Sequence, residues 1–283
     1  MVLNIGWVGN LTSLIKRVLT AMVLVVVLVG TLFFLPPLAA IVLLGIFLLA
    51  GSWEWSGFFL ADRLSLRLAY VLMLMVLATS VSLCLRAGIL IDALLVVAAI
   101  WWLLVAAWLI FSKSGVPAGG CALAGIMGFI PGWYAMMRLF ADPDGAWLFI
   151  WLVVIVAAAD IGAYFVGRSL GRNKLAPQIS PGKTREGLLG GLICASLATA
   201  AGASIAGAPV YVFAGAGALI GLVSVVGDLT VSLFKRSAGL KDSGGILPGH
   251  GGVMDRIDSL IAALPLFVLI LWVSGMLVAN TVA

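Results

Sequence analysis

Long apolar stretches follow one another along nearly the whole chain, and mostly short polar segments separate them. A helix needs about 20 predominantly apolar residues to cross the hydrocarbon core of a bilayer. The pattern therefore predicts an all-α, polytopic integral membrane protein. It indicates about nine transmembrane helices, at residues 18–35, 38–53, 66–85, 89–111, 117–138, 146–166, 187–206, 210–233 and 259–280. The second of these ends beside Trp53 and Trp55, which we expect at the membrane interface.

The composition supports this interpretation and excludes several classes of protein. Of the 283 residues, 64% are hydrophobic and only 10% are charged, whereas a soluble domain carries about 25% charged residues. A soluble globular enzyme, a disordered chain and a nucleic-acid-binding module are therefore excluded. We interpret residues 1–283 as one membrane domain, with N-terminal spans in 1–139 and, in 140–283, C-terminal spans with the longest polar loops. The first apolar stretch follows basic residues, as in a signal peptide, but continues into further apolar sequence and predicts an uncleaved span.

The distribution of basic residues predicts the orientation in the membrane. If the N-terminus lies inside and nine spans alternate, all but two of the 16 Lys and Arg residues fall in inside segments, the exceptions being Arg86 and Arg138. An excess of Lys and Arg is typical of cytoplasmic loops, so we expect an N-in, C-out topology. The two longest polar segments, 167–186 and 234–258, then both face the cytoplasm, and loops often carry function.

The first polar segment contains a candidate anion site. Ser180, Lys183 and Thr184 lie just before a predicted helix start, where backbone amides and a cation favour a bound phosphate. Asp160 precedes the segment inside an apolar span, where a carboxylate is costly and indicates function. The alternatives are that Asp160 only pairs with a polar group of a neighbouring helix, that the basic residues only mark the inside, and that Thr184 only caps a helix.

The second polar segment contains paired carboxylates. Asp228 lies near the inner end of the eighth predicted span and Asp255 at the start of the ninth. These spans run antiparallel, so the connecting loop can bring the two carboxylates together, and Mg²⁺ takes one or two carboxylates beside substrate phosphates. Lys235, Arg236 and Lys241 lie between the two, and with a divalent ion they would hold a triphosphate.

Glycines and a histidine fill the rest of this segment. Five glycines fall within residues 244–252, which indicates close approach of the backbone to a ligand. The chain's one histidine, His250, is open to three interpretations: a metal ligand, a hydrogen-bonding or positioning residue, or a loop residue without a role. Asp258 either caps the ninth helix or reaches the site.

These residues together resemble the signature of a known family. The runs Ser232-Leu-Phe-Lys235-Arg236, Lys241-Asp242, Pro248-Gly-His250-Gly251-Gly252 and Asp255-Arg256-Ile-Asp258 are similar to the signature of the phosphatidate cytidylyltransferases, or CDP-diacylglycerol synthases. Residues 158–191 resemble a second block of that family. The N-terminal half is similar only in being a series of apolar spans, with a weak echo at Glu54-Trp55.

The resemblance implies an activity and a set of roles. It implies transfer of CMP from CTP to phosphatidic acid, giving CDP-diacylglycerol and pyrophosphate for phospholipid biosynthesis. It also implies a Mg²⁺-dependent homodimer among the lipids of the plasma (inner) membrane, acting at the cytoplasmic face, and it leaves open a second, monovalent cation such as K⁺. The resemblance implies metal binding by Asp228 and Asp255. Our further hypotheses are catalysis by Lys235, Arg236 and Asp255, and substrate binding by Ser180, Lys183, Thr184, Lys241, His250 and Asp160, of which Asp160 would support the metal or orient a basic residue.

Other functions stay open at this point. A CTP-dependent lipid kinase of the polyprenol type would transfer the γ-phosphate to a lipid alcohol, and a related synthase would act on an archaeal ether lipid. An ion or solute transporter would explain carboxylates inside spans, such as Asp160 and Asp228, although the polar residues crowd to one side. A structural membrane scaffold would be insensitive to mutation of its loops.

Overall fold

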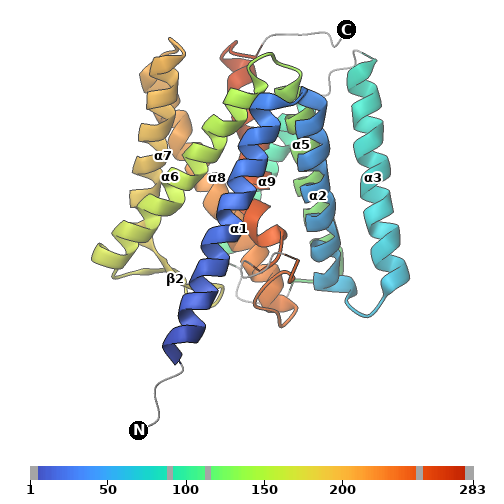
Figure 1. Ribbon diagram of the computed structural model, residues 1–283, viewed down its shortest axis with the longest axis vertical. Helices are drawn as coiled ribbons and strands as arrows, with labels where there is room; N and C mark the ends of the chain where they lie inside the picture. Colours follow the sequence, from blue (N-terminus) through green and yellow to red (C-terminus); the bar gives the residue numbers. More distant parts are fainter. Residues whose placement is uncertain (1–5, 88–91, 112–115, 247–250, 278–283) are drawn as a thin grey trace.

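The computed structural model describes residues 6–87, 92–111, 116–246 and 251–277 (Figure 1). These residues form helices and one two-stranded antiparallel sheet. The elements are α1 (Gly6–Phe34), α2 (Pro37–Leu60), α3 (Leu64–Arg86), α4 (Ala93–Phe111), α5 (Ala118–Phe140), α6 (Gly145–Leu170), β1 (Lys174–Ala176), β2 (Ser180–Thr184), α7 (Arg185–Ile205), α8 (Val210–Ser237) and α9 (Met254–Val273).

Among the described residues, seven helices are long and apolar enough to cross a membrane, namely α2, α3 and α5 to α9. Shorter apolar stretches lie at Met22–Phe34 within α1 and at Ala93–Leu109 within α4. The prediction of an all-α, polytopic membrane protein is confirmed. The count of nine spans stays a prediction, because nothing in the described part of the chain decides whether α1 and α4 also cross the membrane.

Several helix ends differ from the predicted spans by a few residues or more, and two of them bear on the polar end of the protein. The second span was expected to end at residue 53, but α2 continues to Leu60. Trp55 is buried instead of lying at an interface, and its Nε1 donates a hydrogen bond to the Cys121 carbonyl oxygen at 2.9 Å. The ninth span was expected from residue 259, but α9 begins at Met254. The added turn of α2 buries Glu54 and Ser56, and in the added turn of α9 Asp255 is paired with Lys235.

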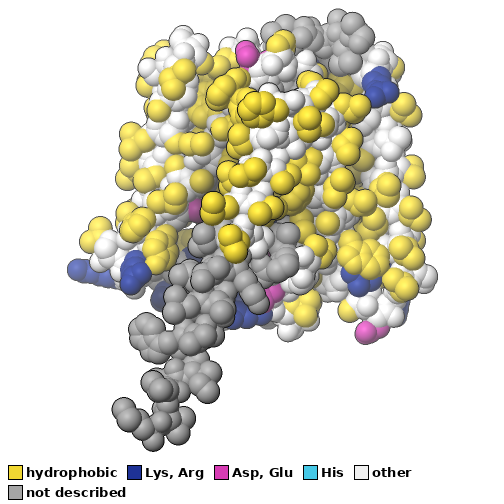
Figure 2. All heavy atoms as spheres, in the orientation of Figure 1, with side chains coloured by type: hydrophobic (Ala, Val, Ile, Leu, Met, Phe, Trp, Pro, Cys, Tyr) yellow, Lys and Arg dark blue, Asp and Glu magenta, His cyan; other side chains and the backbone are white. Residues whose placement is uncertain are grey.

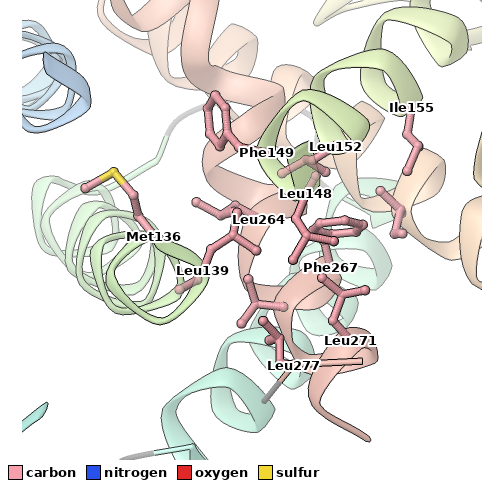
Figure 3. Close-up of a cluster of buried hydrophobic side chains, with 14 of the residues drawn as sticks. Met136, Leu139, Leu148, Phe149, Leu152, Ile155, Leu264, Phe267, Leu271 and Leu277 are labelled. Atoms are coloured by element: carbon pink, nitrogen blue, oxygen red, sulfur yellow. The ribbon is translucent and has the colours of Figure 1, made fainter. Parts of the chain in front are cut away.

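The main apolar core joins α5, α6 and α9. Figure 3 shows Leu139 of α5, Leu152 of α6 and Phe267 of α9 directed into the same space, and all three are fully buried or nearly so. In a bilayer, helices associate through close packing more than through the hydrophobic effect. This core therefore fixes how the N-terminal and C-terminal helices lie against each other.

Helices α6 and α7 approach closely through glycines. A Cβ atom added at Gly162 would lie 2.5 Å from the Cys194 sulfur, and one at Gly191 would lie 2.7 Å from the Ala159 carbonyl oxygen. Small residues at such a crossing let two helix backbones come together. The contact places the part of α6 that carries Asp160 beside the first turns of α7.

The polar parts of the chain gather at one end of the bundle. The β1–β2 hairpin and the segment after α8 both lie at the end where α1 begins, at the bottom of Figure 1. Figure 2 shows most of the visible Lys and Arg side chains at that same end, below a broad apolar band. This arrangement agrees with the uneven distribution of charge along the sequence and defines the region in which a polar site can form.

Candidate active site

A polar cavity of about 360 Å³ opens between α6, α8, α9 and the segment that follows α8. Every side chain that lines it is charged or polar, in a chain with few charged residues. We call it the aspartate cavity. Its lining residues are Asp160, Asp228, Lys235, Asp242, Asp255, Arg256, Asp258 and Ser259.

Two lysine–aspartate ion pairs organise the aspartate cavity. Lys183 of β2 lies with its Nζ 2.6 Å from Asp228 Oδ2, and Lys235 of α8 lies with its Nζ 2.5 Å from Asp255 Oδ1. The side chains of Lys235 and Asp255 are each only 11% exposed. Removing one partner of a buried pair leaves an uncompensated charge, which is strongly destabilising. The structure thus brings Asp228 and Asp255 to one cavity and gives each of them a cationic partner.

Asp255 also holds the segment that precedes α9. Its Oδ2 accepts hydrogen bonds from the backbone N–H of Ser243 at 2.9 Å and of Gly252 at 3.2 Å. Gly251, directly before Gly252 in this segment, has a φ of +79°, a backbone conformation that favours glycine. The neighbouring carboxylate of Asp258 accepts a bond from the Ser259 N–H at 2.7 Å and still faces the cavity. Because α9 begins at Met254, Asp258 lies inside the helix and does not cap it, so the expectation of a helix cap is wrong and the alternative that Asp258 reaches the cavity is confirmed.

A carboxylate from the N-terminal half, Glu54 of α2, supports this segment. Glu54 is 4% exposed, and its Oε2 accepts hydrogen bonds from Ser243 Oγ at 2.9 Å and from the Met254 N–H at 2.8 Å. Its Oε1 has no hydrogen-bond partner among the described residues. Sequence reasoning did not assign Glu54 to the site. The signal was present as a lone carboxylate inside an apolar stretch, which is costly unless it is paired.

The contact with Glu54 also explains part of the glycine-rich segment. These glycines were expected to let the backbone approach a ligand. Instead, a Cβ atom at Gly244 or Gly252 would overlap the Glu54 carboxylate. At least two of the five glycines therefore make room for a side chain of the protein itself, whereas a Cβ atom at Gly245 would meet nothing within 4 Å.

A second cavity, of about 400 Å³, lies under the β1–β2 hairpin, and we call it the hairpin cavity. It has apolar walls as well as polar groups. Asp160 lines both cavities, and Lys183 lines the hairpin cavity while it pairs with Asp228 of the aspartate cavity. The lining residues are Asp160, Ala163, Tyr164, Gly167, Arg168, Leu175, Gly182, Lys183, Thr184, Gly187, Leu188 and Val225.

Local hydrogen bonds fix the hairpin against α7. Thr184 is the N-cap of α7, and its Oγ1 accepts a hydrogen bond from the Gly187 N–H at 3.0 Å. Glu186 accepts bonds from the backbone N–H groups of Arg172 and Asn173, at 3.1 and 3.2 Å. Thr184 is therefore a helix cap, as one alternative held, and it also lines the cavity.

The comparison with known proteins bears directly on these cavities. The sequence model of the cytidylyltransferase family matches residues 15–274, which include both cavities and Glu54. The chain belongs to this family.

Two curated relatives align along nearly their whole length. The chain is 38% identical over 268 residues to a phosphatidate cytidylyltransferase of Pseudomonas aeruginosa. The aligned region covers 92% of this chain and 97% of that protein. It is 35% identical over 292 residues to the phosphatidate cytidylyltransferase of Haemophilus influenzae, with coverage of 89% and 96%. The family resemblance found in the C-terminal motifs therefore extends to the N-terminal helices.

Some residues of the family signature lie away from both cavities. Arg236 is exposed at the end of α8, where its Nη1 donates to the Leu240 carbonyl oxygen at 3.3 Å. Lys241 is exposed in the following segment, and Ser180 pairs with Ala176 in the hairpin. None of these three lines either cavity. His250 lies outside the described residues.

The donor set of this cytidylyltransferase-family protein suits one kind of metal ion. Within the described part of the chain, no three Asp, Glu, Cys or His side chains are grouped closely enough to hold a cation by themselves. Asp228 and Asp255 nevertheless face the same cavity. Such a pair fits Mg²⁺, which takes one or two protein carboxylates and completes its coordination with water and substrate phosphates.

Proposed function

We propose that this protein transfers CMP from CTP to phosphatidate, giving CDP-diacylglycerol and pyrophosphate. The observation that carries the proposal is the aspartate cavity with its two lysine pairs, in a membrane protein of the cytidylyltransferase family. The relatives that align over nearly their full length bear the name phosphatidate cytidylyltransferase. A lipid substrate also accounts for a site built within membrane helices.

The reaction joins two anions, so the site must neutralise charge. A phosphate oxygen of phosphatidate attacks the α-phosphorus of CTP, a new P–O bond forms, and the bond to the β-phosphate oxygen breaks to release pyrophosphate. The attacking oxygen is already anionic and needs little help from a general base. Catalysis of phosphoryl transfer is mostly positioning and electrostatic stabilisation. In this chain, Lys183 and Lys235 are held at the aspartate cavity by their ion pairs, and Arg256 also lines it.

Asp228 and Asp255 are the proposed ligands of Mg²⁺. When bound, the ion would neutralise the phosphates and the departing pyrophosphate. Each aspartate is paired with a lysine, so Lys183 and Lys235 stand where they could bind phosphate oxygens of a nucleotide held at the same carboxylates. A second ion, K⁺, is part of the proposal. Replacing K⁺ with Na⁺ in the labelled-CTP assay described below tests it.

Four further residues support the site from its edge or from outside the cavities. Asp160, at the junction of the two cavities, orients Lys183 or supports the metal. Arg236 and Lys241 lie outside the cavities, where they raise the positive potential that attracts the nucleotide. Ser180 keeps the hairpin that carries Lys183 in place.

The proposal includes a location and an assembly. The protein is integral to the plasma (inner) membrane, with N-in, C-out topology and both cavities on the cytoplasmic side. The support is the gathering of Lys and Arg at the end that holds the cavities. The family resemblance adds a homodimer. Cysteine accessibility in intact cells, at engineered positions near Lys241 and Asp142, tests the sidedness.

The activity is tested with CTP carrying label at the α- or the γ-phosphate. Purified protein in detergent is given phosphatidate and Mg²⁺, and lipid and water phases are separated. The proposal expects α-label in the lipid phase and γ-label in water as pyrophosphate, with both dependent on Mg²⁺. A lipid kinase would instead send γ-label into the lipid phase when a lipid alcohol is supplied. If no CTP is consumed with either lipid, the proposed activity is wrong and a transport function gains support.

A further inference from the structure

The two cavities differ in chemistry. The aspartate cavity is lined only by charged and polar side chains, which suit a nucleoside triphosphate and a metal ion. The hairpin cavity places Leu175, Leu188 and Val225 beside Arg168 and Lys183. A cavity with apolar walls and cations suits an amphiphile that carries an anionic group.

The hairpin cavity also borders the surface that faces lipid. Tyr164 lines the cavity and is 57% exposed, and its neighbours Ile161 and Phe165 on α6 are 57% and 65% exposed. Large apolar side chains exposed on a membrane-spanning helix face the bilayer. A lipid molecule can therefore reach this cavity from the side, whereas the aspartate cavity offers no apolar wall.

The cations of the hairpin cavity are held in place. Arg168 Nη1 donates a hydrogen bond to the Tyr164 hydroxyl at 2.7 Å, which keeps the guanidinium at the cavity. Gly182, the neighbour of Lys183 in the chain, also lines the cavity, and a Cβ atom there would meet nothing within 4 Å, so the space beside it is open. An arginine and a lysine around an open space are suited to a phosphomonoester.

The cavities meet at Asp160 and Lys183. Asp160 lines both, and Lys183 reaches from the hairpin cavity to Asp228 in the aspartate cavity. A phosphate bound beside Lys183 would therefore be a neighbour of a nucleotide bound beside Asp228. This is the juxtaposition that transfer from one substrate to the other requires.

From these observations we propose that the hairpin cavity is the phosphatidate site. The phosphate lies between Arg168 and Lys183, and the glycerol and the first acyl carbons lie against Leu175, Leu188 and Val225. The nucleotide occupies the aspartate cavity, so the two substrates enter from different sides and meet at Lys183. This assignment rests on the proposed function.

The test separates the two substrates kinetically. In mixed micelles, the mole fraction of phosphatidate is varied at saturating CTP, and CTP is varied at saturating phosphatidate. Arg168→Ala is expected to raise the apparent KM for phosphatidate about tenfold, the size expected for losing a charged hydrogen bond, and to leave the KM for CTP within about twofold. Arg172→Ala removes the same charge from an exposed position outside both cavities, and it is expected to change neither value.

A second pair of variants tests the apolar wall. Leu188→Trp fills the cavity and is expected to raise the KM for phosphatidate, whereas Leu189→Trp places the same side chain on the exposed face of α7 and is not. Arg168→Lys keeps the charge and is expected to have a KM for phosphatidate close to that of the wild type. It is the second variant to measure if Arg168→Ala folds poorly.

The outcomes separate this assignment from the activity itself. A shift confined to the KM for CTP in Arg168→Ala and Leu188→Trp would make the hairpin cavity a nucleotide site and overturn the proposal. The proposal is also overturned if both variants keep wild-type kinetics for both substrates while the wild-type protein transfers α-label to lipid. If the wild-type protein itself transfers no label, the proposed function fails and the assignment fails with it.

Discussion

Glu54 of α2 accepts a hydrogen bond from Ser243 Oγ at 2.9 Å, although 189 positions separate the two residues in the chain. The same carboxylate oxygen accepts from the N–H of Met254, the first residue of α9. Ser243 in turn donates its backbone N–H to Asp255. Through this chain of contacts, the N-terminal half of the protein helps to position a residue of the aspartate cavity.

Glu54→Ala is expected to lower both stability and activity. It would leave the buried Ser243 hydroxyl and Met254 N–H without their hydrogen-bond acceptor. Each unsatisfied group is expected to lower the free energy of unfolding by about 1–3 kcal/mol. Glu54→Gln keeps an oxygen acceptor, and its amide nitrogen can take the place of Oε1. We expect Gln to stay near wild type in thermal unfolding in detergent and in kcat. Equal damage from Gln and Ala would show that the negative charge itself is required.

The glycines beside Glu54 offer a matched pair of variants. Gly252→Ala would push a Cβ atom into Ser243 and Glu54, whereas Gly245→Ala would place it in open space. We expect Gly252→Ala to reduce kcat at least tenfold through displacement of Asp255, an effect of the size seen when a supporting contact of a metal ligand is lost. Gly245→Ala serves as the control. Similar activities of the two variants would contradict the tight packing described here.

Asp255→Asn and Asp228→Asn test the proposed metal ligands. Each removes a carboxylate from the aspartate cavity and the partner of a lysine. We expect activity to fall by roughly 100-fold or more, as when a key electrostatic contact to a transition state is removed, and the Mg²⁺ concentration for half-maximal activity to rise. Asp62→Asn, at an exposed position between α2 and α3, is the control. Full activity with an unchanged Mg²⁺ titration would exclude metal binding by the residue that was changed.

An ion pair at the opposite end of the bundle should matter for stability alone. Arg138 Nε lies 3.3 Å from Asp92 Oδ1, and the Tyr134 hydroxyl donates to the same oxygen at 2.8 Å. Arg138 is only 3% exposed. We expect Arg138→Met to cost about 3 kcal/mol, because it leaves a buried carboxylate unpaired, and to leave both KM values unchanged. Thermal unfolding measures the first effect, and an unchanged melting temperature would contradict it.

The sequence predicted most of this architecture for a simple reason. Long apolar stretches have few alternatives to membrane helices, and antiparallel neighbours joined by one segment bring Asp228 and Asp255 to the same end. The hairpin at 174–184 was not predicted, because a short turn of polar residues carries no periodic signal. Ser180, Arg236 and Lys241 lie near the cavities in sequence but do not line them, since position along a loop does not fix where a side chain points. Glu54 was noted only as a weak echo of the family and was not assigned to the site, because its partners Ser243 and Met254 come from the far end of the chain.

The distance along the chain between Glu54 and α9 has a consequence for biosynthesis. Helix α2 is made and inserted long before Met254, which is 200 positions later. Until then the Glu54 carboxylate lacks the hydrogen bonds from Ser243 and Met254, and an unpaired carboxylate within an apolar helix is costly. The last helix therefore supplies Asp255 and relieves this cost in the same step. A nascent chain that is interrupted before α9 would therefore lack activity and would also be poorly assembled. A cell could then remove such incomplete copies before they sequester substrate.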